Sequence, residues 1–169
     1  PSEAAKAGTV EDYLRETYAL EYQLHEVHIP ADGTLVDTAV GEAEAHSGIR
    51  IVAILTADDF VIGPPRDALL PAQAGIAEVV IPPGSRLVGQ TVRDVWMRKR
   101  YGLSVLAIHR GGETLTDDIR EAVFTAGDTL ITYNTWAALV RIEQDRNFVV
   151  VTSDYPHEET RPHKVPHAL

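Results

Sequence analysis

Short apolar runs alternate with a helical pattern in the second half of the chain. Val79–Ile81 is β-branched and is followed by prolines at 82 and 83, which cannot donate to a ladder, so it is expected to be a strand. Val88, Val92, Val95 and Trp96 follow the i, i+4, i+7, i+8 spacing of an amphipathic helix. This helix is expected to end at Tyr101-Gly102, because glycine takes the left-handed C′ conformation without steric cost.

The pattern continues with a hairpin, a further strand and a second helix. Leu103–His109 predicts a strand, with Gly111-Gly112 as the hairpin turn and 113–116 as the return strand. A tight turn at 126–128 leads into the strand Thr129–Tyr133. Asn134 or Thr135 can cap the next helix, whose inward face would be Trp136, Leu139 and Val140. Phe148–Val151 is expected to return as a strand, which predicts an α+β class with a two-layer α/β sandwich.

The first half repeats part of this unit. Residues 25–30 match residues 77–82 at an offset of 52. After a two-residue gap, Gly48 falls on Gly102 and Ile51–Ile54 falls on Val105–Ile108, so Gly48 is expected to end a helix in the same C′ role. Such a period indicates two copies of one supersecondary unit. The first copy, over 24–75, ends before its last strand and helix, whereas the second, over 76–152, is complete.

The two ends of the chain lie outside the repeats. Residues 1–23 are expected to form a helix and linker, with the helix over Val10–Gln23 and Thr9 as its N-cap. Residues 153–169 contain three prolines and three histidines and are expected to form a linker.

Charge is distributed unevenly along the 169 residues. Residues 1–75 hold 13 acidic and 4 basic residues, and residues 76–169 hold 12 acidic and 11 basic residues. The acidic balance argues against a nucleic acid partner, because duplex binding needs a basic face. The favoured interpretation of this asymmetry is a solvated acidic surface that keeps the protein soluble, and the alternative is that an anionic ligand binds the second half. The chain has 44% hydrophobic residues, no cysteine, and no apolar run near the ~18 residues that cross a bilayer.

No motif in the chain predicts catalysis. Glycine-rich dinucleotide and phosphate loops and the Gly-x-Ser-x-Gly elbow are all missing from the sequence, so no catalytic residue is assigned and the protein is not expected to be an enzyme. A hydrolase remains a distant alternative. The seven histidines are interpreted as surface residues and no metal site is expected, since His25 and His28 would point to opposite faces of a strand. The acidic pairs at 58–59 and 117–118 are interpreted as turn residues.

The basic run Arg98-Lys99-Arg100-Tyr101 is the best candidate for a binding site. A guanidinium offers paired donors suited to phosphate, and a tyrosine ring can stack on a base. The alternative is a solvated helix end, where cations complement the negative end of the helix dipole.

These motifs together resemble the C-terminal RCK domain, or TrkA-C domain, of bacterial ion channels and transporters. The resemblance rests on Glu78–Pro82, Ser85–Thr91, Arg98–Gly102, the run from Val105 to Gly112, and Ala126–Leu130. It implies a ligand-sensing, dimerising module rather than an enzyme. Some members of that family bind cyclic di-AMP at a dimer interface, through an arginine at the position of Arg98 and an asparagine at the position of Ser104. The ligand-binding residues that the resemblance implies are Arg98, Tyr101, Ser104, Val79, Val80, Ile81 and Val88.

Tandem copies without a Rossmann half resemble the cytoplasmic loop of divalent-anion:sodium symporters. This implies a homodimer, a membrane-embedded transporter domain in the same polypeptide as its partner, and a place at the cytoplasmic face of the inner membrane. Cyclic di-AMP is the implied regulatory ligand, and no other cofactor is expected. The alternative is a structural dimerisation module of the transporter that binds no ligand.

Overall fold

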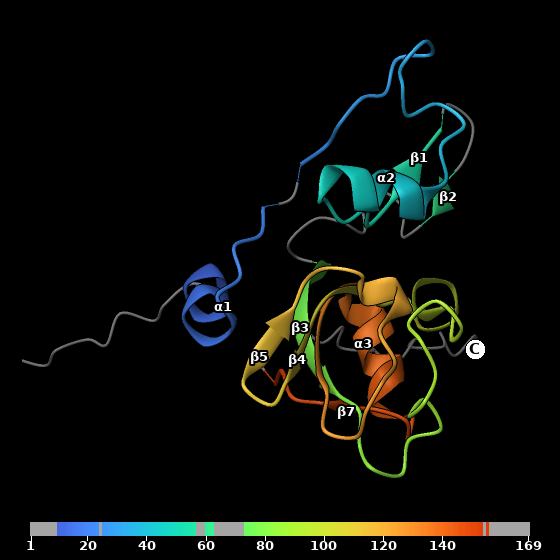
Figure 1. Cartoon of the computed structure of the whole chain (residues 1–169). Coiled ribbons are helices and arrows are strands. Elements are labelled where there is room, and N and C mark those ends of the chain that lie inside the picture. The colour runs from blue at the N-terminus through green and yellow to red at the C-terminus, as the bar shows by residue number, and fades with distance from the viewer. Residues whose placement is uncertain (1–9, 24, 57–59, 63–72, 154, 156–169) are drawn as a thin grey trace, which may run out of the picture.

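A five-stranded antiparallel sheet forms the centre of the molecule in the computed structural model, which describes residues 10–23, 25–56, 60–62, 73–153 and 155 (Figure 1). The strands lie in the order β5-β4-β6-β3-β7. Their bounds are β3 Ala74–Val80, β4 Ser104–Arg110, β5 Glu113–Leu115, β6 Thr129–Thr135 and β7 Val149–Val150. The sheet and its helices confirm the predicted α+β class, and each of the four predicted strands that follow residue 100 is present within two residues of its expected bounds.

Helix α3, Trp136–Glu143, covers one face of this sheet and begins where the sequence predicts. The Thr135 hydroxyl accepts a hydrogen bond from the Ala138 N–H at 3.1 Å, which satisfies one of the free donors of the first turn. Leu139 and Ile142 point inward and pack with Val79, Leu103 and Leu130 in the main core. Val140 is 40% exposed, contrary to expectation, because Ala138, Leu139 and Ile142 fill the inward face.

The opposite face of the sheet is covered by α1, Val10–Tyr18, and by the residues that follow it (Figure 1). Leu14, Tyr18 and Leu20 are buried against Ala107 of β4 and Ile131 of β6. The helix ends at Tyr18, five residues earlier than predicted, because Ala19 adopts a left-handed conformation with φ of 55°. The expected cap, Thr9, lies outside the described residues. The α1 layer is an addition to the two layers that the sequence predicts.

The predicted amphipathic helix from Val88 to Trp96 is wrong. This stretch is a series of turns, followed by one π-helical turn, η2 Met97–Tyr101, which ends as expected at Gly102 with φ of 73°. The Gly89 N–H donates to the Phe124 carbonyl and the Phe124 N–H donates to the Gln90 carbonyl, both at 2.9 Å. These bonds hold the backbone in an extended pairing that a helix does not allow. Val88 and Trp96 are therefore exposed, whereas Val95 is buried.

Residues 25–56 and 60–62 form a separate lobe above the sheet, which we call the α2 lobe (Figure 1). It holds α2 Val40–Ser47 and a small hairpin of β1 Ile54–Leu55 and β2 Phe60–Ile62. Helix α2 ends at Gly48, with φ of 68°, as predicted. The strand expected at residues 25–30 is not formed, since these residues are exposed and pair with no described strand. The acidic pair at 58–59 lies outside the described residues.

Candidate functional site

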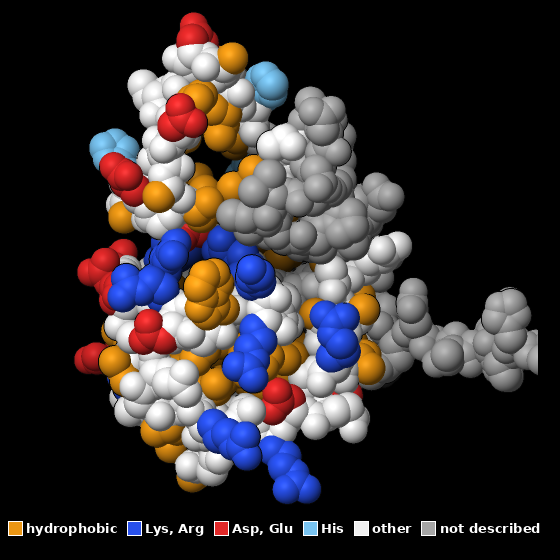
Figure 2. Space-filling model, turned by 90° about the vertical axis from the view of Figure 1, so that its right-hand side faces the viewer, with side chains coloured by type: hydrophobic (Ala, Val, Ile, Leu, Met, Phe, Trp, Pro, Cys, Tyr) orange, Lys and Arg blue, Asp and Glu red, His pale blue; other side chains and the backbone are white. Residues whose placement is uncertain are grey.

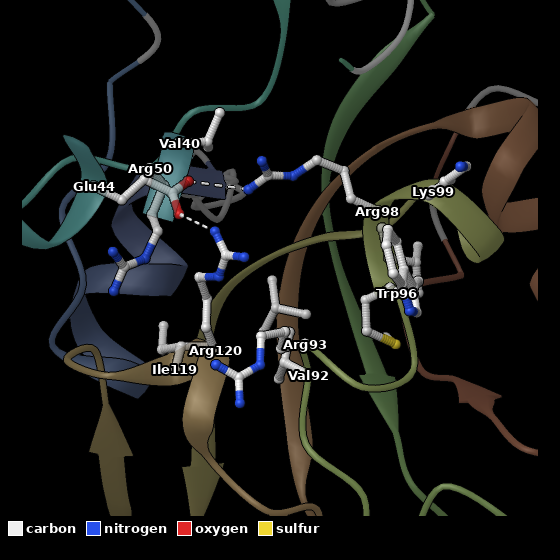
Figure 3. A pocket seen from close by; sticks show the side chains of 13 residues that line it. Val40, Glu44, Arg50, Val92, Arg93, Trp96, Arg98, Lys99, Ile119 and Arg120 are labelled. Carbon is white, nitrogen blue, oxygen red and sulfur yellow. Dashed lines mark hydrogen bonds and ion pairs between the residues drawn. The ribbon is translucent and has the colours of Figure 1, made fainter. Parts of the chain in front are cut away.

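A cavity of about 600 Å³ lies between the α2 lobe and the sheet domain (Figure 3). One wall comes from α2 and the residues after it, and the other comes from the turn before η2 and from η3, the 3-10 helix Ile119–Glu121. The lining residues are Val40, Glu44, Arg50, Val92, Arg93, Trp96, Met97, Arg98, Lys99, Leu103, Val105, Ile119 and Arg120. The floor is apolar and the rim is charged, a combination typical of small-molecule sites.

Positive charge dominates the rim of this cavity. Five cationic side chains line it, Arg50, Arg93, Arg98, Lys99 and Arg120, against the single carboxylate of Glu44 among its described lining residues. Figure 2 shows a group of Lys and Arg side chains gathered around hydrophobic ones on this side of the molecule. A concave surface of one charge sign attracts counter-ions, so the cavity suits an anion.

Glu44 is a buried carboxylate inside this basic cavity. Its side chain is 3% exposed and accepts a hydrogen bond from Arg98 Nη2 at 3.0 Å and one from the Ile51 N–H at 2.9 Å. Arg120 Nη1 lies 4.0 Å from its other oxygen. Figure 3 shows both arginines reaching toward Glu44 from the sheet domain. The carboxylate therefore occupies the place where the guanidinium groups would hold an external anion.

The remaining cations differ in how firmly they are held. Arg93 forms an ion pair with Glu121 at 2.7 Å, and both side chains are more than half exposed. Arg50 donates to the Thr116 carbonyl, which links the α2 lobe to the sheet domain. The Lys99 ammonium lies 5.5 Å from the centre of the Trp96 ring.

Trp96 is an exposed aromatic ring at the edge of the cavity. It is 64% exposed, and its backbone is left-handed with φ of 54°, which is uncommon for a large side chain. This conformation ends the preceding turns and keeps the indole out of the core. A flat ring beside several guanidinium groups can stack on a planar base while the cations hold a phosphate.

Of the seven residues that the sequence implicates in ligand binding, Arg98 lines the cavity and six do not. Val79 and Ile81 are fully buried in the core, and Tyr101 is 8% exposed and packs edge-on against Phe148 at 4.9 Å. Ser104 is 5% exposed at the start of β4. Val80 is half-buried where β3 pairs with β7, and Val88 is 39% exposed outside the cavity. The structure does not bring these seven side chains together, and their shared role stays a prediction.

Sequence reasoning missed Glu44, Trp96 and Arg120 as parts of the site. Trp96 was placed on the inner face of a helix, and that helix is not formed. Glu44 and Arg120 are 76 residues apart in the chain, and only the docking of the α2 lobe brings them together. The sequence feature that could have indicated this contact is the contrast between the acidic first half and the basic segment near residue 98.

A second buried charge lies away from the cavity, at Asp128. Its carboxylate accepts two hydrogen bonds from Arg110, both at 2.7 Å, and two from Thr125, at 2.8 and 2.9 Å. Burial by itself raises the pKa of Asp128, but these donors outweigh it and hold the pKa below its usual value. This cluster joins the end of β4 to the turn before β6, and it serves the fold.

Other kinds of site were sought in the part of the chain that the structure describes. No three His, Asp or Glu side chains gather there as a metal site would require, and His25 and His28 are both exposed. None of the helices formed by these residues has the length and apolar character needed to span a bilayer.

Comparison with known proteins supports the resemblance to transporter domains. The family model of the TrkA-C domain matches residues 76–134. YfbS of Escherichia coli K12, described as an uncharacterized transporter, is 31% identical over 98 residues, or 56% of this chain. Sodium/sulfate cotransporter 1 of Chlamydomonas reinhardtii is 37% identical over 67 residues, or 38% of this chain. The matches cover 16% of the first protein and 7% of the second.

Among solved structures, the chain is similar to the RCK_C domain dimer of S. agalactiae BusR in complex with c-di-AMP. The superposition covers 43% of this chain and 88% of that chain, at 16% identity and a TM-score of 0.38. The overlap is too loose to carry an argument about this chain. The family match falls within the second predicted copy, so the first copy remains a prediction.

Proposed function

We propose that this chain is a regulatory domain of a membrane anion transporter, and that it senses a small anionic ligand in the cavity beside Arg98. Its partner would be the membrane-embedded transporter domain of the same polypeptide, at the cytoplasmic face of the inner membrane. The TrkA-C match over residues 76–134 supports a regulatory role, and the transporter relatives support this context.

The observation that carries the ligand proposal is that the exposed Trp96 indole lines the same cavity as five cationic side chains. A nucleotide has a planar base and an anionic phosphate, and the cavity offers a partner for each. Arg98 belongs to this cavity and is also the residue that the resemblance to cyclic di-AMP binders implicates. Cyclic di-AMP is therefore the first ligand to test.

Binding would be measured by titration calorimetry with cyclic di-AMP, alongside cyclic di-GMP, ATP and AMP. We expect saturable binding of cyclic di-AMP. Trp96→Ala should weaken it by about 10-fold, since stacking on a base contributes ~1–3 kcal/mol. Arg98→Ala should weaken it by a similar factor, because it removes a charge-assisted contact to phosphate.

Arg86→Ala is the matched control, since Arg86 is exposed and does not line the cavity. It should leave the affinity unchanged. Equal affinity in the Arg98→Ala, Trp96→Ala and Arg86→Ala proteins would remove the cavity from the proposal. A thermal-shift series reports the same binding, because a ligand of the folded state raises the unfolding temperature.

The second candidate function is a dimerisation module that binds no ligand. It is favoured by the ion pair between Glu44 and Arg98, which leaves this guanidinium already bound to a carboxylate, and by the burial of Tyr101 and Ser104. Its expected signature is a stable dimer by light scattering together with no response to any of the four nucleotides.

A further inference from the structure

The α2 lobe contacts the sheet domain largely through polar groups. No described residue between 25 and 56 belongs to either of the two hydrophobic clusters. The contacts across the boundary include those of Glu44 with Arg98 and Arg120, and that of Arg50 with the Thr116 carbonyl. The docking of this lobe therefore depends strongly on charge, and little on buried apolar surface.

Helix α2 approaches the arginines closely at Gly41. A Cβ atom built at this position would lie 2.5 Å from Arg120 Nη1, so the glycine leaves room for the guanidinium against the helix backbone. A glycine inside a helix costs about 1 kcal/mol relative to alanine. The contact between the helix and Arg120 that this glycine allows offsets part of that cost. It also places the Glu44 carboxylate near the same guanidinium.

We propose that Glu44 is a built-in competitor for the anion site, and that an incoming phosphate group displaces it from Arg98 and Arg120. Displacement would break the ion pairs that hold α2 and release the α2 lobe from the sheet domain. The inference deepens the proposed function, because it assigns a conformational output to the same cavity. It requires only a phosphate anion, and not a particular nucleotide.

Glu44 and an incoming phosphate would compete because both bind Arg98 and Arg120. Pyrophosphate carries more negative charge than a carboxylate, and a phosphodiester carries the same single charge. Both accept the same paired guanidinium donors, so either can compete with Glu44 for Arg98. A ligand shifts a conformational equilibrium only by its differential affinity for the two states. Here the undocked state exposes both arginines, and the ligand prefers it for that reason. Removal of the competing carboxylate must then tighten ligand binding, since coupling between two sites is reciprocal.

The test compares wild type with Glu44→Gln, and uses Glu42→Gln as the matched control. Glu42 lies on the same helix but is exposed, and it does not line the cavity. Inorganic pyrophosphate and cyclic di-AMP are the two probes. Affinity is measured by calorimetry, and docking of the lobe is measured by hydrogen exchange of the amides in residues 40–47.

We expect Glu44→Gln to bind pyrophosphate at least 10-fold more tightly than wild type, and Glu42→Gln to match wild type. Pyrophosphate should also speed exchange of the α2 amides in the wild-type protein. In Glu44→Gln these amides should exchange fast without any ligand, while the strands of the sheet stay protected. That protection also shows that the variant has folded.

Three results would overturn the inference. Binding to Glu44→Gln that is weaker than or equal to wild type would make Glu44 a ligand contact or a structural residue. Slower exchange of α2 on adding pyrophosphate would mean that the ligand closes the lobe. Absence of pyrophosphate binding to both proteins would also exclude displacement by phosphate. If pyrophosphate releases α2 and cyclic di-AMP does not bind, displacement stands and the nucleotide part of the proposed function fails.

Discussion

At the scale of single residues, Asp128 shows how a buried charge can stabilise the fold. It has no exposed surface, and its two oxygens accept four hydrogen bonds from Arg110 and Thr125. The sequence contains both halves of this cluster, in the His109–Gly112 and Ala126–Asp128 motifs. It does not reveal that they pair, because the ladder between β4 and β6 brings them together.

Replacement of this carboxylate should destabilise the protein. Asp128→Asn removes the charge from two hydrogen bonds with Arg110, and hydrogen bonds to charged groups each contribute ~1.5–3 kcal/mol. We expect the free energy of unfolding at pH 7 to fall by about 2–3 kcal/mol in urea titrations. Asp117→Asn, at an exposed turn position, should change it by less than about 0.5 kcal/mol.

The same cluster gives a pH dependence of defined sign. Because the folded protein lowers the pKa of Asp128 below the value of 3.8 in an unfolded chain, the stabilisation is complete above that value and is lost as pH falls below it. The difference between wild type and Asp128→Asn should therefore shrink as pH falls from about 4 to about 2. A constant difference over this range would show that the charge of Asp128 does not contribute.

Arg98 and Tyr101 illustrate the limit of reading a site from its residues. Both are residues suited to a nucleotide, and they lie three positions apart. The π-helical turn places Arg98 in the cavity and Tyr101 in the core against Phe148. The exposed aromatic ring beside the cavity is instead Trp96, whose backbone is left-handed.

At the scale of elements, α1 is held to the sheet by a buried carboxylate as well as by apolar packing. Glu78 on β3 is 8% exposed and accepts hydrogen bonds from the hydroxyls of Tyr13 and Tyr18. Burial raises the pKa of Tyr18, and the hydrogen bond to Glu78 raises it further. The helix pattern of residues 10–18 is visible in the sequence, but the surface that it covers is not.

Loss of the Tyr18 hydroxyl should loosen α1. Tyr18→Phe removes one donor from a buried carboxylate, and we expect the free energy of unfolding to fall by about 1–2 kcal/mol. Hydrogen exchange should become faster in residues 10–18 and stay unchanged in β6. Tyr13→Phe should have a smaller effect, because Tyr13 is 46% exposed.

Alkaline pH should act on the same contact. Because folding raises the pKa of Tyr18 above its usual value of 10.0, this stabilisation is complete below pH 10 and is lost as pH rises above it. Wild type should therefore lose more stability than Tyr18→Phe above pH 10. Equal losses in the two proteins would contradict the assigned role of Tyr18.

The strands and turns are easier to predict from the sequence than the conformation of residues 88–96, where a helix is expected but turns are formed. Residues 104–110 lie between Gly102 and Gly111, and residues 129–135 follow Gly127. Both segments contain β-branched and apolar side chains, and these are local features. The stretch 88–96 has a helical spacing of valines, but its backbone pairs with residues 123–124. That pairing is a long-range interaction, and it overrides the local pattern.

At the scale of the whole molecule, the two halves differ in charge and meet at the cavity. Glu44 of the acidic half lies against Arg98 and Arg120 of the second half. The sheet also has two edges, formed by β5 and β7, among the described strands. Val149 and Val151, at and just after β7, are 51% and 50% exposed, and an exposed apolar edge favours pairing with another chain.

We expect a homodimer that uses the β7 edge. Light scattering of the wild type should give twice the chain mass of 18.5 kDa. Val149→Lys should return the mass to that of one chain, because a charge at a strand edge opposes edge-to-edge pairing. Val140→Lys, on the exposed side of α3, is the control and should stay dimeric. A dimer that survives Val149→Lys would place the contact elsewhere.

The sequence alone specifies several elements through local signals. These are the strands after residue 100, the turn at 111–112, the cap at Thr135 and the ends of η2 and α2 at their glycines, each governed by neighbouring residues. It also indicated Arg98 as an anion-binding residue. The neighbours of Arg98 in the cavity depend on tertiary contacts. Glu44, Trp96 and Arg120 come together there through backbone pairing and docking of the α2 lobe, which join residues far apart in the chain.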